Sequence, residues 1–556
     1  MEKPLIVQGA AGSGKTTIAL HRLAYLLYTY SDTFDSEDFM IIGPNNLFLD
    51  YISNVLPELG ADNIKQSTYV DFMFELIGDK YKVTDSNKKL NELIRTDSKA
   101  LKVNEKEMII KSSKLKNSME MKNLLDSFIN NVEKRVLPDE DYTIEGFPIL
   151  SSSEISDLYY ESYGYQPILK RIESIKKYLK GYTKNSIKDI LKEINHKYTE
   201  ELRLLREDPE DSPEKKLKMI GLMEEREGTL KKAEKNAKKA ADKFIKKFKT
   251  NNLLGFYKEF ISNLDEYYSE DINLGKYISK ETKKLINKKT LEIEDLASVV
   301  YLKDRFFGIN ENLDIKVAVI DEAQDFSEFQ FFVLHRVLDT ERFTILGDLS
   351  QGIHMYRAVE NWDYVKDSIF NEDVNYLTLE QSYRTTIEIM NLANEVLSQT
   401  DTSQLIKAKP VVRHGEDPVI QELREDKKIT SNIIKQLYKW DNDSLTTVAI
   451  VTKSNEEAKK IFCEITALNK SLDIELVDEN SEHFNHKILV IPAHLSKGLE
   501  FDGVIITTLN EDYTFETLDT KLLYVAMTRA MHRLAIYCKK DSIPHIKDKN
   551  TGKIAV

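Results

Sequence analysis

Eight residues near the start of the chain combine glycines, a lysine and hydroxyls in the order that binding of a triphosphate needs. Residues 9–16 read GAAGSGKT and follow directly on the apolar run of residues 5–7. Glycines let backbone N–H groups curl around phosphates, the lysine reaches the β and γ oxygens, and the threonine can ligate Mg²⁺. A strand should precede this loop and a helix should start near Thr17. We expect contacts to a nucleoside triphosphate from Gly9, Gly12, Ser13, Gly14, Lys15, Thr16 and Thr17.

A second motif ends an apolar run with two acids. Residues 317–325 read VAVIDEAQD, so Asp321 and Glu322 follow the apolar segment directly. This arrangement places one carboxylate on Mg²⁺ and the next on the attacking water. We therefore predict that Asp321 shares the metal with Thr16 and that Glu322 is the catalytic base.

Three further side chains suit the chemistry of a γ-phosphate. Gln351 ends the segment GDLSQ after the next apolar run, where an amide can reach the phosphate or the water. Arg384 and Arg529 each lie where a strand or loop meets a helix in the second half of the chain. Two arginines delivered from a neighbouring domain would make hydrolysis conditional on closure of the domains. The alternative, that either arginine forms an ordinary surface ion pair, stays open at this point.

Composition bounds the class of protein. A chain of 556 residues with 41% hydrophobic content predicts three or four domains of an ordinary globular protein. The two cysteines cannot form a disulfide framework, which favours a reducing compartment, and we expect the cytoplasm. No run approaches 18 apolar residues, and Met1 lies too close to the first strand for a signal peptide, so we expect no membrane partner.

Charge is distributed unevenly along the chain. The net charge of −13 argues against a uniformly basic surface, so any contact with nucleic acid must be local. Residues 136–162 hold seven acids and no lysine or arginine, whereas residues 230–249 hold nine lysines against two acids. Both segments are also compatible with ordinary solvated faces.

The pattern of apolar residues predicts an α/β fold with a helical insertion. A strand, helix and strand precede residue 67, and long helical segments rich in Lys and Glu occupy the region from about 85 to 292. Two prolines in residues 207–213 predict a hairpin tip between two helices. The strand pattern returns at residues 315–320 and 343–346, and a second series of strands is expected at 375–379, 447–451, 487–491 and 503–507. The expected domains are residues 1–84 with 293–373, the insertion 85–292, and the second domain 374–556.

The ordered motifs together resemble the superfamily-one motor ATPases of the UvrD, Rep and PcrA type. They read GAAGSGKT, IIGPN, QSTYVDF, VIDEAQD, GDLSQGIHMYRA, LEQSYRTT, HLSKGLEFD and LLYVAMTRA, and they extend from Gly9 to Ala530. The wording of residues 7–28, 48–60 and 345–354 is more similar to the HelD branch, ATPases that release bacterial RNA polymerase from nucleic acid. The resemblance implies two RecA-like P-loop domains with parallel sheets, with ATP and Mg²⁺ in the cleft between them.

The resemblance also implies roles for particular residues. Gln351 would sense the γ-phosphate, Arg384 and Arg529 would act as arginine fingers, and Glu500 would lie near the ribose. Four positions match residues that touch single-stranded nucleic acid in the helicases: Thr68, Tyr69, Tyr356 and His494.

The sequence departs from the family pattern at three places. The glutamine motif that recognises adenine upstream of the P-loop is missing, and so is the N-terminal arm of the HelD relatives. Only about 110 residues separate Arg384 from His494, too few for a helicase-sized insertion in the second domain. His354 stands at the first of two aromatic positions, where stacking of a base on a ring contributes ~1–3 kcal/mol. The short gap in the second domain and the changed aromatic position favour a translocase or remodelling enzyme over a processive unwinding enzyme.

The leading hypothesis is an ATPase that couples domain closure to release of core RNA polymerase from DNA or RNA. On this hypothesis the acidic residues 136–162 are a candidate DNA mimic. One alternative is a DNA repair helicase with 3′ to 5′ polarity, which predicts strong stimulation by single-stranded DNA alone. The other is an inactive fragment that binds polymerase, which predicts no turnover.

Overall fold

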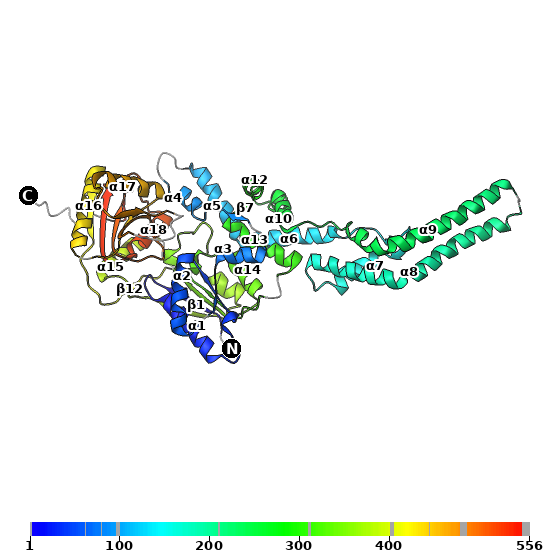
Figure 1. Cartoon of the computed structure of the whole chain (residues 1–556). Coiled ribbons are helices and arrows are strands. Elements are labelled where there is room, and N and C mark those ends of the chain that lie inside the picture. The colour runs from blue at the N-terminus through cyan, green and yellow to red at the C-terminus, as the bar shows by residue number, and fades with distance from the viewer. Residues whose placement is uncertain are drawn as a thin grey trace, which may run out of the picture. The chain divides into compact units, whose positions relative to one another are not determined.

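The computed structural model describes residues 3–61, 63–78, 81–95, 101–209, 212–309, 313–400, 405–443, 445–478 and 486–546. The chain forms two compact units (Figure 1). The first unit contains Met1–Met121, Asp271–Ala297 and Glu311–Val556, and the second contains Lys122–Glu270 and Ser298–Asn310. No helix within these described ranges is both long enough and apolar enough to cross a bilayer.

The first unit contains a six-stranded sheet in the order β10-β1-β9-β8-β2-β3, in which neighbouring strands are parallel. Its central strands are buried along their whole length, as parallel strands covered on both faces are. Because the strands are parallel, the loops that follow β1, β8 and β9 meet at one edge of the sheet. The strands are β1 (Leu5–Gly9), β2 (Phe39–Gly43), β3 (Lys65–Thr68), β8 (Val317–Ile320), β9 (Phe343–Gly347) and β10 (Asn375–Leu379).

One strand belongs to a different sheet from the one expected. The sequence analysis assigned residues 375–379 to the second series, but β10 pairs with β1, with Leu5 opposite Asn375. Four of its five residues are exposed, as on an edge strand. The order of strands along the chain does not reveal this pairing, because an edge strand can join either sheet.

A second parallel six-stranded sheet lies in the same unit, in the order β13-β18-β17-β14-β16-β15. The strands are β13 (Val419–Leu423), β14 (Val448–Thr452), β15 (Ile474–Leu476), β16 (Ile488–Pro492), β17 (Phe501–Thr507) and β18 (Ala530–Lys539). Its helices are α15 (Ile387–Leu397), α16 (Asp426–Asn442), α17 (Asn455–Leu468) and α18 (Thr517–Met527). The expected fold class, α/β with two parallel sheets and a large helical insertion, is confirmed. The ten-residue β18 was not anticipated.

The other helices of the first unit lie between the strands of the first sheet along the chain. They are α1 (Lys15–Thr29), α2 (Asn46–Val55), α3 (Tyr69–Ile77), α4 (Lys88–Ile94), α5 (Val103–Asn117), α12 (Ile272–Ile286), α14 (Glu328–Leu338) and the start of α13 (Ile293–Phe307). The short strands β4 (Lys82–Val83) and β7 (Thr290–Leu291) pair in parallel. A buried ion network joins α5 to α13, since the Lys116 ammonium lies 2.7 Å from Glu292 and 2.8 Å from Asp295.

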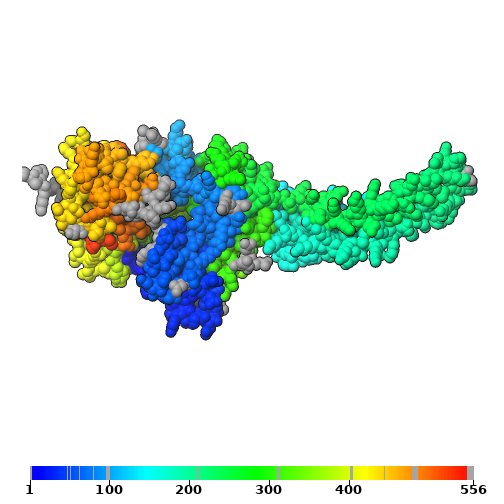
Figure 2. Space-filling view, viewed as in Figure 1, coloured from blue at the N-terminus to red at the C-terminus, as the bar shows by residue number. Residues whose placement is uncertain are grey.

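The second unit is dominated by the long helices α8 (Ile168–Glu207) and α9 (Pro213–Ile245), which form a hairpin. They lie side by side in Figures 1 and 2, drawn in cyan and green. Ile190, Ile194 and Tyr198 of α8 pack with Ala233 of α9. The predicted break is confirmed: α9 begins with Pro213, and the Ser212 side chain caps it by accepting from the Lys215 N–H at 3.2 Å. Positions 210 and 211 of the predicted tip lie outside the described residues. The remaining elements are α6 (Met119–Val136), β5 (Tyr142–Ile144), β6 (Phe147–Leu150), α7 (Ser152–Asp157), α10 (Leu253–Ser262) and α11 (Leu264–Tyr267).

Several acids of the segment 136–162 have partners within this unit. Glu140 forms an ion pair with Lys247. Asp141 accepts from the Ser152 N–H at 2.8 Å, and Glu145 accepts from the Asn236 amide at 2.7 Å. Glu154 caps α7, its own helix. These contacts give the acids a role in the fold of the second unit, and their action as a DNA mimic stays a prediction.

Candidate active site

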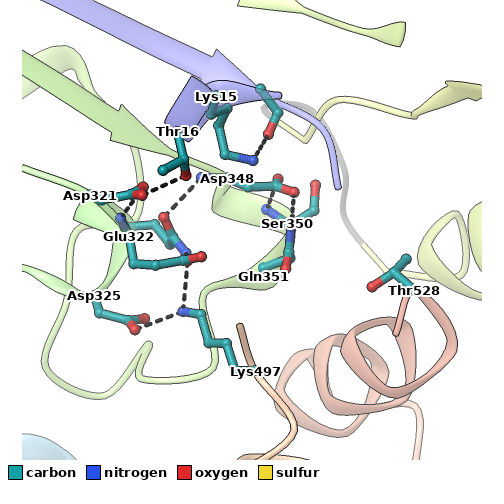
Figure 3. Close-up of polar contacts among 12 residues, drawn as sticks. Lys15, Thr16, Asp321, Glu322, Asp325, Asp348, Ser350, Gln351, Lys497 and Thr528 are labelled. Carbon is teal, nitrogen blue, oxygen red and sulfur yellow. Dashed lines mark hydrogen bonds and ion pairs between the residues drawn. The ribbon is translucent and has the colours of Figure 1, made fainter. Parts of the chain in front are cut away.

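The loop after β1 curls tightly enough to leave no room for side chains at Gly9 and Gly12. Gly12 and Gly14 have φ values of 70° and 79°, in the left-handed region that favours glycine. A Cβ at Gly9 would lie 2.5 Å from Lys15 Cγ and 2.6 Å from Ser13 Oγ. The Lys15 ammonium donates across the loop to the carbonyl of Gly9 at 2.9 Å (Figure 3). The backbone therefore forms a cradle at the N-terminus of α1, where the helix dipole favours an anion.

The two acids after β8 lie against this cradle. Thr16 Oγ1 donates to Asp321 Oδ2 at 2.6 Å, and the Glu322 N–H donates to Asp321 Oδ1 at 2.8 Å (Figure 3). Burial, reinforced by the neighbouring Glu322 carboxylate, raises the pKa of Asp321. Glu322 has a φ of 50°, which a non-glycine residue rarely adopts, and such backbone strain is typical of functional sites.

A lysine from the other sheet's domain holds the second acid in its ionised form. The Lys497 ammonium lies 2.6 Å from Asp325 and 3.5 Å from Glu322 (Figure 3). Burial alone would raise the pKa of Glu322, but the charge of Lys497, with a further contribution from Lys15, lowers it below its usual range. Glu322 is thus a half-buried, ionised carboxylate that is able to accept a proton at neutral pH.

Amide side chains connect the acids to the end of β9. Gln324 donates to Glu322 and accepts from the Asp348 N–H at 2.9 Å. The Gln351 amide donates to Asp348 Oδ2 at 2.7 Å. The three consecutive loops of the first sheet therefore share one hydrogen-bond network.

Arg529 continues that network into the second domain. Its Nη2 donates to Gln351 Oε1 at 2.6 Å, and its Nε donates to the carbonyl of Val525 at 3.2 Å. The side chain is only 1% exposed. Burial, followed by the nearby charge of Arg384, lowers the pKa of Arg529 to about 10, so the guanidinium stays charged at neutral pH.

Arg384 lies directly against the phosphate loop. A Cβ added at Gly12 would meet Arg384 Cβ at 2.4 Å, and the N–H of Tyr383 donates to the Gly12 carbonyl at 2.9 Å. Arg384 Nη2 pairs with Glu500 at 2.5 Å. The strand β11 (Gln381–Ser382) and the start of α15 thus position one arginine over the loop, while α18 positions the other.

These side chains surround one cavity of about 860 Å³. That volume is in the range of sites for small ligands and cofactors. Thr17 and the exposed ring of Tyr383 also line it. The predicted residues on its walls are Gly12, Ser13, Gly14, Lys15, Thr16, Thr17, Glu322, Gln351, Arg384, Glu500 and Arg529, while Gly9 and Asp321 lie behind them in direct contact with Lys15 and Thr16.

The site offers what a magnesium nucleoside triphosphate needs. The hydroxyl of Ser13, on the wall of the cavity, is buried and has no hydrogen-bond partner among the described residues, so it is available to a ligand oxygen. Thr16 and Asp321 supply hard oxygen ligands. The described part of the chain contains no cluster of three or more His, Cys, Asp or Glu side chains suited to a metal. Mg²⁺ suits such a sparse set, because it completes its shell with water and substrate phosphates.

The four predicted contacts to nucleic acid do not line this cavity. Thr68 caps α3 by accepting from the Asp71 N–H at 3.1 Å. Tyr69 is buried with its ring against Phe326 at a centroid distance of 5.3 Å. Tyr356 and His494 are 4% and 5% exposed. Because three of the four side chains are interior in this conformation, their contact with bases stays a prediction.

Sequence reasoning missed four residues of the site: Gln324, Asp348, Tyr383 and Lys497. All four lie within motifs quoted above, but their types alone give no role. The ring of Tyr383 can stack on a base, and Lys497 sets the charge of Glu322, yet both functions depend on contacts between distant segments.

Comparison with known proteins agrees with this architecture. A family model described as the UvrD-like helicase C-terminal domain matches residues 377–478, and another with that description matches residues 487–537. The chain is 25% identical over 223 residues to the ATP-dependent DNA helicase PcrA of Bacillus subtilis (strain 168), covering 38% of this chain and 30% of PcrA. It is 26% identical over 228 residues to the ATP-dependent DNA helicase srs2 of Schizosaccharomyces pombe, covering 36% and 26%.

A solved structure also matches: the C-terminal domain of a possible DNA helicase from Lactobacillus plantarum WCFS1. It is 25% identical, covers 31% of this chain and 96% of that one, and has a TM-score of 0.26. The chain spans less than a third of the length of the two curated relatives. The family models and the relatives show that part of this chain is similar to helicases of the UvrD and PcrA type. The narrower HelD assignment stays a prediction.

Proposed function

We propose that this protein hydrolyses ATP with Mg²⁺ and uses domain closure to move along or remodel nucleic acid. The observation that carries the proposal is the convergence of both domains on one cavity. Lys15, Thr16 and Glu322 line it from the first domain, and Arg384 and Arg529 line it from the second. Relatives that are named as ATP-dependent DNA helicases support the same proposal.

The contacts of each side chain in the cavity suit it to one role in ATP binding or hydrolysis. Thr16 and Asp321 would hold Mg²⁺, which would neutralise negative charge on the triphosphate. Glu322, ionised and half-buried, takes the proton of the attacking water. The ring of Tyr383 stacks on the base of the nucleotide.

Both arginines now rest on acceptors that a γ-phosphate would replace. Arg529 is bonded to Gln351, and Arg384 is bonded to Glu500. We expect each guanidinium to exchange its acceptor for phosphate oxygens in the reactive complex, where charge-assisted bonds are stronger. Because Gln351 also bonds Asp348, arrival and loss of the γ-phosphate change the link between the two domains.

The test is ATP hydrolysis measured with no addition, with single-stranded DNA and with core RNA polymerase. Lys15→Ala and Glu322→Gln should each reduce turnover at least about a hundredfold. The control Lys284→Ala removes an exposed lysine on α12 and should leave turnover unchanged. Stimulation by DNA alone favours the helicase reading, and stimulation only by polymerase favours the polymerase-release reading. Hydrolysis no higher than that of Lys15→Ala under all three conditions would overturn the proposal.

A further inference from the structure

The proximal part of α9 carries a dense set of lysines that the proposed ATP site does not use. Residues 231–247 contain eight lysines and two acids in a chain of net charge −13. Lys231 pairs with Glu227, and Lys247 pairs with Glu140. The other six are exposed, and none has a carboxylate within ion-pair distance among the residues that the structure describes: Lys232, Lys235, Lys238, Lys239, Lys243 and Lys246. We call these six residues the α9 lysine face.

The geometry of the helix gathers most of these charges on one side. At about 100° per residue, Lys235, Lys238, Lys239 and Lys246 lie within about 60° of Asp242. The opposite side buries Ala233, Ala241 and Phe244 in the hairpin core. Figure 2 draws this stretch of the hairpin in green, exposed at the surface of the second unit.

The one acid of α9 on this side, Asp242, is already neutralised, and the residues that neutralise it extend the positive surface. Asp141 and Glu145 line a hollow next to the α9 lysine face, and both accept hydrogen bonds within the unit. Asp242 pairs with Lys176 at 2.7 Å and with Lys180 at 3.1 Å, both from α8. Two cations on one carboxylate leave an excess of positive charge. The positive surface therefore continues from α9 onto α8.

On α8, nearer the tip of the hairpin, several charged residues are paired with opposite charges on the same helix. Toward the tip, Lys192 pairs with Asp189, and Arg203 pairs with both Glu200 and Glu207. Such pairs at i,i+3 and i,i+4 support a helix, whereas the like charges at Lys235, Lys239 and Lys243 oppose it. The paired residues lie on α8, whereas the like charges without a carboxylate partner among the described residues lie on the part of α9 at the base of the hairpin. That part of α9 is therefore suited to a polyanion.

We propose that the α9 lysine face binds the phosphodiester backbone of nucleic acid, at a site separate from the ATP cavity. From Lys235 to Lys246 the helix rises about 16 Å, which matches about five phosphates at 3.4 Å per nucleotide. The exposed residues between 231 and 247 are all polar, and the exposed apolar residues Leu217 and Ile220 lie nearer the tip. An anionic membrane would need apolar side chains on the same face, so nucleic acid fits better.

This inference rests on the proposed function for its ligand class, but its test does not use ATP. Binding of a fluorescein-labelled 30-nucleotide single strand and a 30-base-pair duplex to the full chain is measured by anisotropy at several salt concentrations. The variant is Lys235→Gln/Lys239→Gln/Lys246→Gln, because glutamine keeps the helix propensity. The control is Lys192→Gln/Arg203→Gln/Lys218→Gln, which removes three charges from the distal hairpin.

The triple variant should raise the Kd about tenfold or more at 50 mM salt. The slope of log K against log salt should fall by about 2 for the single strand or about 2.7 for the duplex, because three phosphate contacts are lost. The nucleic acid, single strand or duplex, whose affinity falls more in the triple variant is the form that the α9 lysine face binds. The control should stay within about twofold of the unsubstituted chain.

Three outcomes would overturn the inference: an unchanged Kd and slope in the triple variant, an equal loss in the control, or loss of binding to phosphatidylserine vesicles with DNA binding intact. Circular dichroism verifies that the hairpin stays helical. Repeating the measurement with Lys15→Ala separates the two proposals, because this variant should lose hydrolysis and keep this binding. If the unsubstituted chain binds the strand through these lysines but hydrolyses no ATP, only the proposed ATPase function is contradicted.

Discussion

Lysine serves two different physical purposes in the cavity and on the hairpin. Lys497 is 10% exposed and touches two carboxylates, so its charge acts over a few ångströms at low effective dielectric. The lysines at 235, 239 and 243 are exposed and have no carboxylate partner among the described residues. Their charges are screened by salt and act as a sum. Burial and ion-pair partners decide whether a lysine shifts the pKa of one neighbouring carboxyl group or adds to the attraction of a polyanion.

Of the substitutions that distinguish the cavity from the hairpin, Arg529→Ala is expected to have the largest effect, which is on the rate of hydrolysis. Arg529→Ala should reduce kcat on the order of 10³-fold, because an arginine that meets the transferring phosphate stabilises charge formed in the transition state. Arg529→Lys should recover little of it, since an ammonium does not reproduce the guanidinium fork. Single-turnover hydrolysis measures both. Arg533→Ala, in the strand β18 that follows Arg529 and paired with Glu416, should stay near the unsubstituted rate. An equal loss of rate in that variant would remove the distinction.

A smaller effect, on stability, is expected at Lys497. Lys497→Met leaves the half-buried carboxylates of Glu322 and Asp325 without their cation, so the free energy of unfolding should fall by about 1–3 kcal/mol, less than for a fully buried pair. Adding Asp325→Asn should recover part of the loss, because one unpaired charge is removed. Denaturant unfolding measures the change. Lys284→Met, in an exposed pair, should be neutral within error; a comparable loss in that variant would contradict the contrast.

The smallest effect is expected on the hairpin, with the opposite sign. Lys235→Gln/Lys239→Gln/Lys246→Gln should keep or slightly raise the stability of the hairpin, since each like-charge pair at i,i+4 costs about 0.2–0.5 kcal/mol. Thermal unfolding followed by circular dichroism checks this. A clear loss of helicity would contradict this expectation, because it would show that these lysines stabilise the hairpin.

Much of the fold follows from patterns that are local in the sequence. The apolar runs at residues 5–7, 317–320 and 448–451 are strands, and the prolines after residue 207 do separate two helices. The edge strand at 375–379 was assigned to the wrong sheet, because strand pairing is a long-range property. The same reason hides Lys497, whose partners lie about 170 residues earlier in the chain.

The sequence by itself determined the phosphate loop, since a strand, a glycine turn and a helix N-terminus are contiguous and need only local backbone geometry. It also determined where lysines are dense. Only the tertiary structure decided that Arg529 meets Gln351 across 178 positions, and that Lys247 pairs with Glu140 while Lys235 has no carboxylate partner among the described residues. Those outcomes depend on which distant side chains share a few ångströms, and packing sets those distances.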